Sequence, residues 1–116
     1  MKHTPFYEEL IGRGLPSIAQ VSKISRERRT VDTHFYHDDE ELYACGFDSA
    51  TEQVFGFRVF RSKPIALGYW GRVSLNWLEN SHSELGIKFL INQDFQSGQL
   101  ATNVRRIREC LNYDAD

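Results

Sequence analysis

Three segments of alternating apolar and polar residues, joined by short polar turns, constrain the fold of this chain more than any other feature. They span residues 30–36, 42–47 and 54–61. Strict alternation places every second side chain on the same face of a strand. The two intervening stretches are too short for a crossover helix, so consecutive strands run antiparallel. The sequence therefore predicts a meander of antiparallel hairpins.

Helices are predicted around this meander. Thr4 is suited to cap a helix that starts at Pro5, and Ser74 to cap a short middle helix. Ser97 is suited to cap a last helix, which carries an apolar stripe at helical spacing. We expect this stripe to pack on the sheet, and its residues are Leu100, Val104, Ile107 and Leu111.

The remaining segments complete a single α+β domain over residues 1–116. Residues 17–24 and 85–91 have the composition of further strands, whereas the glycines in 63–72 predict a loop. A chain of this length is typical of one domain. We predict an antiparallel sheet of about four to five strands, with an N-terminal, a short middle and a C-terminal helix packed on it.

The ends of the chain and its cysteines favour a cytoplasmic protein without a membrane partner. No apolar run is long enough to span a bilayer, and residues 1–10 lack the apolar core of a secretory signal. Cys45 and Cys110 lie far apart, and neither belongs to a Cys-x-x-Cys pair. We expect two reduced, buried thiols.

Charges alternate in bands along the chain, although the net charge is only −2. Cations gather in 23–29 and in 53–78, and acids fill 32–52 between them. A meander brings the acidic turn at 38–41 next to Arg61 and Lys63, and the acidic turn at 48–52 next to Arg28 and Arg29. We expect the bands to neutralise each other at both ends of the sheet, which disfavours a nucleic-acid surface.

The segment 34–41 contains the donor types of a divalent metal site. Its candidates are His34, His37 and Asp38. An odd spacing on a strand points the two imidazoles to opposite faces, so we predict no metal and no cofactor here. A metal-dependent enzyme using these residues remains an alternative. The chain has no Gly-x-Ser-x-Gly and no phosphate-binding loop, so no catalytic residue is assigned.

The best candidate contact surface lies in the predicted loop. Tyr69, Trp70 and Arg72 are of the types enriched at interface hot spots, and Trp70 could instead fold back on the sheet beside Trp77. A second candidate cluster lies near the C-terminus and consists of Arg105, Arg106 and Arg108. The rings and cations of 53–78 also suit single-stranded nucleic acid.

Several short runs of two to four residues, spread over the middle two thirds of the chain, resemble a small domain family of unknown function carried on bacterial mobile elements. They are Phe35-Tyr36, Phe47-Asp48, Val54-Phe55-Gly56-Phe57, Leu67-Gly68-Tyr69, Ser74-Leu75, Leu78-Glu79, Leu85-Gly86 and Asp94-Phe95. The chain departs from the family where residues 70–73 separate Leu-Gly-Tyr from Ser-Leu, and in its longer C-terminal helix. The family has no established activity, so the resemblance implies no site residues.

The absence of catalytic signatures and the small size favour a non-enzymatic binding or regulatory module that acts through a protein partner. A nucleic-acid-binding accessory protein with a basic and aromatic surface is the second hypothesis, and the metal-dependent enzyme is the third. A homodimer is compatible with all three.

Overall fold

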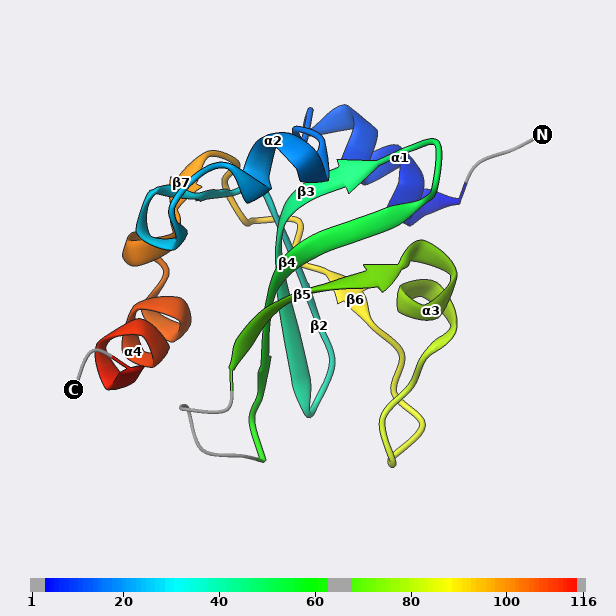
Figure 1. Cartoon of the computed structure of the whole chain (residues 1–116). Helices are drawn as coiled ribbons and strands as arrows, with labels where there is room; N and C mark the ends of the chain where they lie inside the picture. Colours follow the sequence, from blue (N-terminus) through cyan, green and yellow to red (C-terminus); the bar gives the residue numbers. More distant parts are fainter. Residues whose placement is uncertain (1–3, 63–67, 115–116) are drawn as a thin grey trace.

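The computed structural model describes residues 4–62 and 68–114, with side chains to residue 110. A five-stranded antiparallel sheet forms its centre, with the strand order β5-β4-β3-β2-β6 (Figure 1). The fold is therefore α+β with an antiparallel meander, as the alternation predicts. The strands are β2 (Thr33–Tyr36), β3 (Glu40–Asp48), β4 (Gln53–Phe60), β5 (Tyr69–Ser74) and β6 (Leu90–Ile91).

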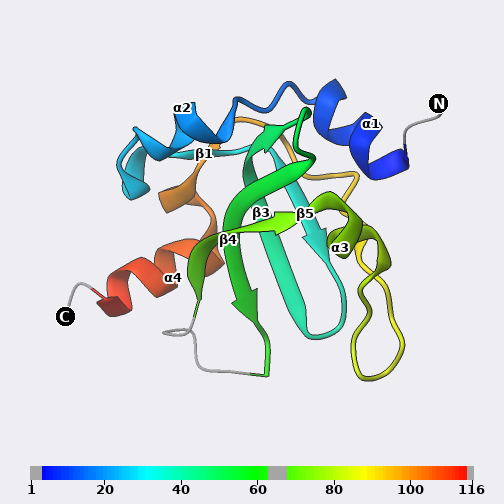
Figure 2. The ribbon, with the colours of Figure 1, turned by 45° about the vertical axis from the view of Figure 1, so that its right-hand side comes forward.

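Helices and a small two-stranded ribbon surround the sheet (Figure 2). The ribbon pairs β1 (Thr30–Val31) with β7 (Gln99–Leu100). The helices are α1 (Pro5–Gly12), α2 (Ile18–Ser22), α3 (Leu75–Asn80) and α4 (Arg105–Asp114), with 3-10 turns η1 (Arg26–Arg28) and η3 (Ala101–Asn103).

Apolar side chains cover both faces of the sheet. On one face, which we call the α1 face, Phe35 and Leu42 pack with residues of α1 and α3. On the other, the α4 face, Tyr43 and Phe57 pack with Ile107 of α4 and with α2. Burial on both faces leaves almost every residue of β3 inaccessible to solvent, so polar groups on this strand need partners within the fold.

The predicted caps of the first and middle helices are confirmed. The Thr4 hydroxyl accepts a hydrogen bond from the Tyr7 N–H, and the Ser74 hydroxyl accepts one from the Trp77 N–H. Each satisfies a backbone donor that the first turn of a helix leaves open.

Two predicted segments have a different structure. Residues 17–24 contain the helix α2 rather than a strand, because Ser17 and Gln20 form a reciprocal capping box. The predicted loop 63–72 becomes the strand β5 from Tyr69 onward, and residues 63–67 lie outside the described part.

Position 68 requires a glycine because the surrounding residues leave no room for a side chain. A Cβ at this position would lie 2.8 Å from Cys110 Sγ and from the Phe57 ring. The glycine therefore marks a close approach of the backbone to α4, rather than the loop that the sequence predicted.

The C-terminal region also departs from the prediction. The last helix starts at Arg105, and the Ser97 hydroxyl donates to the Asp32 carbonyl instead of capping it. Val104 and Ile107 are buried as expected, but Leu100 lies in β7 and is 42% exposed. The side chain of Leu111 lies outside the described residues. Within 85–91, only Leu90–Ile91 forms a strand.

Arg13 connects α1 to distant parts of the chain. Its guanidinium donates to the carbonyl oxygens of Asp32 and Phe95, and its Nε lies 2.7 Å from Glu9. The residue thereby fixes α1 against the connection between β6 and β7.

Candidate functional site

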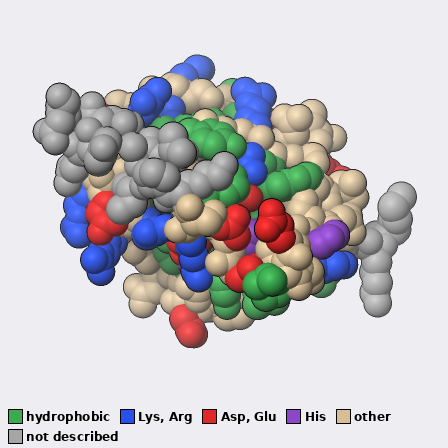
Figure 3. All heavy atoms as spheres, turned by 90° about the horizontal axis from the view of Figure 1, so that it is seen from below, with side chains coloured by type: hydrophobic (Ala, Val, Ile, Leu, Met, Phe, Trp, Pro, Cys, Tyr) green, Lys and Arg blue, Asp and Glu red, His purple; other side chains and the backbone are tan. Residues whose placement is uncertain are grey.

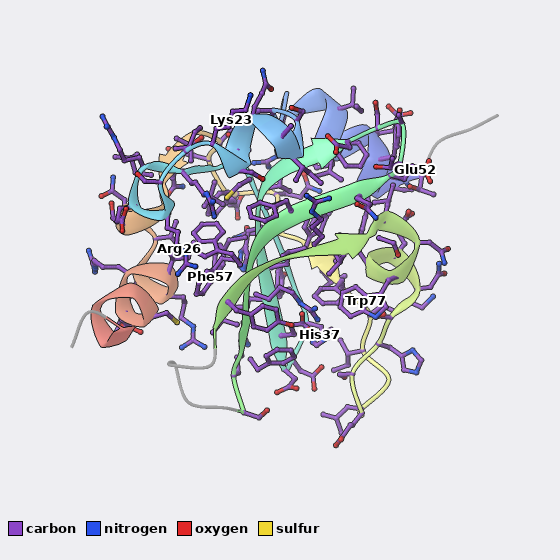
Figure 4. All side chains as sticks on the ribbon, in the orientation of Figure 1. Lys23, Arg26, His37, Glu52, Phe57 and Trp77 are labelled. Carbon is purple, nitrogen blue, oxygen red and sulfur yellow. The ribbon has the colours of Figure 1, made fainter. Side chains whose placement is uncertain are left out.

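The two histidines considered as metal ligands lie on opposite sides of the sheet, as their spacing predicts. The His34 ring stacks on Tyr43, 4.4 Å between centroids, on the α4 face. The His37 ring lies 4.3 Å from Phe89 in the α1-face core. Figure 4 shows His37 beside Trp77 and away from Phe57. The described residues contain no group of three potential metal ligands.

A buried carboxylate on the α4 face collects several polar side chains. The Tyr43 hydroxyl donates to Glu41 Oε1 at 3.1 Å, and His34 Nε2 lies 3.2 Å from the same oxygen. Arg106 Nε lies 3.2 Å from Glu41 Oε2, and Arg61 Nη2 lies 3.6 Å from Oε1. We call these five residues the Glu41 network.

The strand register explains why the network forms. His34 of β2 lies opposite Tyr43 of β3, and Glu41 lies two residues along the same strand and on the same face. Arg61 directly follows the last residue of β4, and Arg106 lies in the first turn of α4. Two strands, the residue that follows β4 and one helix therefore supply the network.

Both ring nitrogens of His34 are used inside the fold. Asn92 Oδ1 accepts a hydrogen bond from the Asp94 N–H, which directs Asn92 Nδ2 toward His34 Nδ1 at 3.2 Å. With Nε2 directed at Glu41, the imidazole has no nitrogen left for a metal or a substrate. The arrangement favours a structural role.

Charges in the network shift two pKa values. Burial alone would raise the pKa of Glu41, but the hydrogen bonds from His34 and Tyr43, together with the electrostatic effect of neighbouring groups such as Arg61, lower it to about 2. Burial and the adjacent carboxylate raise the pKa of Tyr43 well above its ordinary value. Glu41 is therefore ionised in the folded protein, and Tyr43 keeps its proton.

A smaller charged cluster occupies the α1 face. Arg58 Nε lies 2.7 Å from Glu40 Oε2, and its guanidinium stacks 4.8 Å from the Trp77 ring and 5.5 Å from the Tyr69 ring. His37 Nδ1 accepts the backbone N–H of Glu40. Arg58 is thus neutralised beside aromatic rings.

A cavity of about 300 Å³ opens next to the β2–β3 turn. Figure 3 views this end of the molecule and shows acidic side chains near the middle, with cations mainly toward the side of α4. Asp38, one of the metal candidates, is in its wall, while His34 and His37 are not. The cavity is lined by Asp38, Asp39, Ser62, Ser83, Glu84 and Leu85.

The three C-terminal arginines differ in their contacts. Arg106 belongs to the Glu41 network, and Arg105 Nε lies 2.8 Å from Glu109. Arg105 and Arg108 are exposed, whereas Arg106 contacts a buried carboxylate, so a contact surface built from all three stays a prediction.

The residues predicted around Trp70 lie on β5, with side chains on alternate faces. Trp70 is half-buried on the α4 face, where it stacks on Phe55 at 6.0 Å and meets Phe57 edge-on at 5.2 Å. The Arg29 guanidinium lies 4.7 Å from the Trp70 ring centroid. Trp70 therefore does fold back on the sheet, but on the face opposite Trp77. Tyr69, on the α1 face, is 44% exposed.

The outer edge of β5 has backbone groups that the sheet leaves open. The Leu75 N–H donates to the Glu52 carbonyl, which places Leu75 and Glu52 at a hydrogen-bonded position of the β4–β5 ladder. Hydrogen-bonded pairs alternate along an antiparallel ladder, and in the observed register the next ones are Val73 with Val54 and Gly71 with Gly56. Trp70 and Arg72 consequently direct their N–H and C=O groups outward, where no described strand pairs with them.

The expected neutralisation of charge occurs at one end of the sheet only. Arg61 reaches Glu41 as predicted, and Lys63 lies outside the described residues. At the other end, Asp48 accepts the Ile18 N–H instead of pairing with a cation. Within the described part of the chain, Arg28, Arg29 and Arg72 form no ion pair.

Sequence reasoning missed Tyr43 and Asn92, and it considered Glu41 only within the donor segment 34–41 and Arg29 only within a band of charge. The spacing of Glu41 and Tyr43 was a usable signal. The structure starts β3 at Glu40, so both side chains lie on the same face of one strand. The sequence contains no such signal for Asn92 and Arg29, because their positions in the structure depend on contacts with residues distant in the chain.

None of the described helices has the length and apolar composition needed to cross a bilayer. Comparisons of the chain with models of known families, with curated proteins and with solved structures find no match. The resemblance to a mobile-element domain family therefore stays a prediction.

Proposed function

We propose that this chain is a cytoplasmic protein-interaction module that binds an extended segment of a partner along β5. The supporting observation is the outward-facing N–H and C=O groups of Trp70 and Arg72. Such groups accept an additional strand, and backbone hydrogen bonds then supply affinity.

The lengths of the two edge strands support the choice of β5 as the binding edge. The opposite edge strand, Leu90–Ile91, has only two residues, whereas β5 has six. A longer edge offers more backbone hydrogen bonds to an incoming strand. The proposal includes no catalytic role, because the most perturbed carboxylate, Glu41, is fully engaged by its own neighbours.

Single-stranded nucleic acid is the second candidate, favoured by the arginines beside Phe55 and Trp70. Base stacking needs an aromatic face that a base can reach. One partner of the Trp70 ring is Phe55, and Arg29 lies over both rings. These contacts occupy the rings, so the observation favours a protein segment.

Backbone amide hydrogen exchange tests the proposal. In the protein alone, the N–H groups of Trp70 and Arg72 should exchange rapidly, while those of Gly71 and Val73 are protected. A peptide selected from a displayed library of short random sequences should slow the exchange of Trp70 and Arg72.

Two variants at one position provide the control. Arg72→Pro removes an outward N–H without removing a hydrogen bond to β4, and should abolish peptide binding. Arg72→Gln keeps that N–H and should retain peptide binding, weakened only by the loss of the positive charge. Failure to select any peptide, or protection confined to α4 or the cavity, would contradict the proposal.

A further inference from the structure

We propose that the segment accepted by β5 carries acidic residues at alternate positions, with apolar residues between them. This inference rests on the proposed function and specifies the chemistry of the partner. It follows from the unequal charge on the two sides of the β5 edge.

The α4 side of the edge is cationic. Arg72 lies opposite Phe55 in the register, is exposed, and forms no ion pair with any described residue. Arg29 lies over the Phe55 and Trp70 rings and is likewise without an ion pair. Its guanidinium is partly desolvated, and burial lowers its pKa from the ordinary value. An anionic side chain above this surface would meet the exposed charge of Arg72 and, beneath it, the buried charge of Arg29, neither of which forms an ion pair with a described residue.

The α1 side of the same edge is aromatic and has no excess charge. Tyr69 is 44% exposed here. The nearest cation is Arg58, which is neutralised by Glu40 at 2.7 Å and lies over the Tyr69 ring. An apolar side chain fits this side better than a charged one, because it buries the exposed part of the ring.

Strand geometry converts this asymmetry into a sequence pattern. Successive side chains of an added strand point to opposite faces of the sheet. Residues on the α4 side would face Arg72 and Arg29, and those on the α1 side would face Tyr69. The partner segment therefore alternates acidic and apolar residues.

A second copy of the chain fits the edge less well. The segment Tyr69–Ser74 contains no acid. Pairing β5 with itself would bring the cations of two copies onto the same face, and like charges at close range disfavour pairing. Charge complementarity thus favours a different, acidic segment.

Synthetic peptides of matched composition test the pattern by fluorescence anisotropy. The probe has alternating Glu and Val; one control has Lys in place of Glu, and another has the same Glu and Val arranged in two blocks. The alternating acidic peptide should bind at least about tenfold more tightly than either control, and its affinity should fall with added salt.

Charge reversal at the edge gives the matched variant test. Arg72→Glu should weaken binding of the acidic peptide by about tenfold or more and improve binding of the Lys peptide. Lys88→Glu makes the same change of charge on the exposed segment between α3 and β6, away from β5, and should leave both affinities nearly unchanged.

The outcomes separate this inference from the proposed function. Equal binding of the acidic and Lys peptides, with Trp70 and Arg72 amides protected, would overturn the alternating-acid pattern and leave strand addition standing. Peptide binding that survives Arg72→Pro would overturn strand addition itself. Oligothymidylate that displaces the peptide from the native protein, or a dimer that protects the same two amides, would assign the edge to nucleic acid or to a second copy.

Discussion

The Glu41 network and the outer edge of β5 use similar residues on the same face of the sheet, but they differ in how their charges are satisfied. In the network, Arg61 and Arg106 surround a buried carboxylate. At the edge, Arg29 and Arg72 lie beside aromatic rings, and none of the described acids pairs with them. The first arrangement pairs its cations with a buried carboxylate, whereas the second leaves its cations without an ion pair among the described residues.

The difference arises from where the sheet places its acids. The hairpin of β2 and β3 puts Glu41 on the α4 face near the end at which Arg61 leaves β4. At the opposite end, the available acid, Asp48, satisfies a backbone donor of α2. A chain with alternating bands of charge can therefore be neutralised at one end and remain cationic at the other.

The largest expected effect comes from removing the network carboxylate. Glu41→Gln keeps the shape of the side chain but leaves Arg106 and Arg61 without their counter-charge. We expect the free energy of unfolding to fall by ~3 kcal/mol, as is typical when one member of a buried pair is removed. Urea denaturation measures it, with the exposed Glu84→Gln as control. An equal, small change in both variants would show that the network does not stabilise the fold.

The pH dependence of stability should report the same carboxylate. The pKa of Glu41 is about 2 in the folded protein against an ordinary 4.5, so the unfolded chain binds its proton more readily. This contribution, roughly 3 kcal/mol, is present above pH 4.5 and is lost as the pH falls toward 2. Denaturation across this range should be less pH-dependent in Glu41→Gln than in the native protein; parallel curves would refute the assignment.

The smallest expected effect is at the edge. Arg72→Gln removes an exposed cation that has no described partner, so the free energy of unfolding should change by less than ~0.5 kcal/mol. Thermal or urea denaturation checks this. A loss comparable to that of Glu41→Gln would mean that Arg72 is engaged within the fold, and the contrast between the two regions would disappear.

The fold was largely predictable, because alternation and capping act locally. Thr4 and Ser74 cap the helices expected of them, and the three alternating segments form β2 to β4 with adjoining β1. The errors occur where two local signals compete. Ser17 and Gln20 form a capping box within residues that also suit a strand, and Gly68 marks a close contact with Cys110 rather than a turn.

The candidate sites were less predictable, because they depend on register and on contacts between distant segments. Tyr69, Trp70 and Arg72 were identified by residue type, but their division between two faces follows from the pairing of β5 with β4. The contact of Arg106 with Glu41 depends on where α4 starts. That start is Arg105, beyond the cap that the sequence suggested at Ser97.

The contacts of Arg13 have a consequence for the order in which the molecule is assembled. Its guanidinium hydrogen-bonds to the carbonyl of Phe95, which lies 82 residues further along the chain. During synthesis, α1 emerges early but lacks this anchor until the connection between β6 and β7 has followed. Closing so long a loop is slow compared with forming local hairpins. The helix α1 is made before the segment that anchors it and should therefore be among the last elements to dock, and Arg13→Ala should act mainly by speeding unfolding rather than by slowing folding.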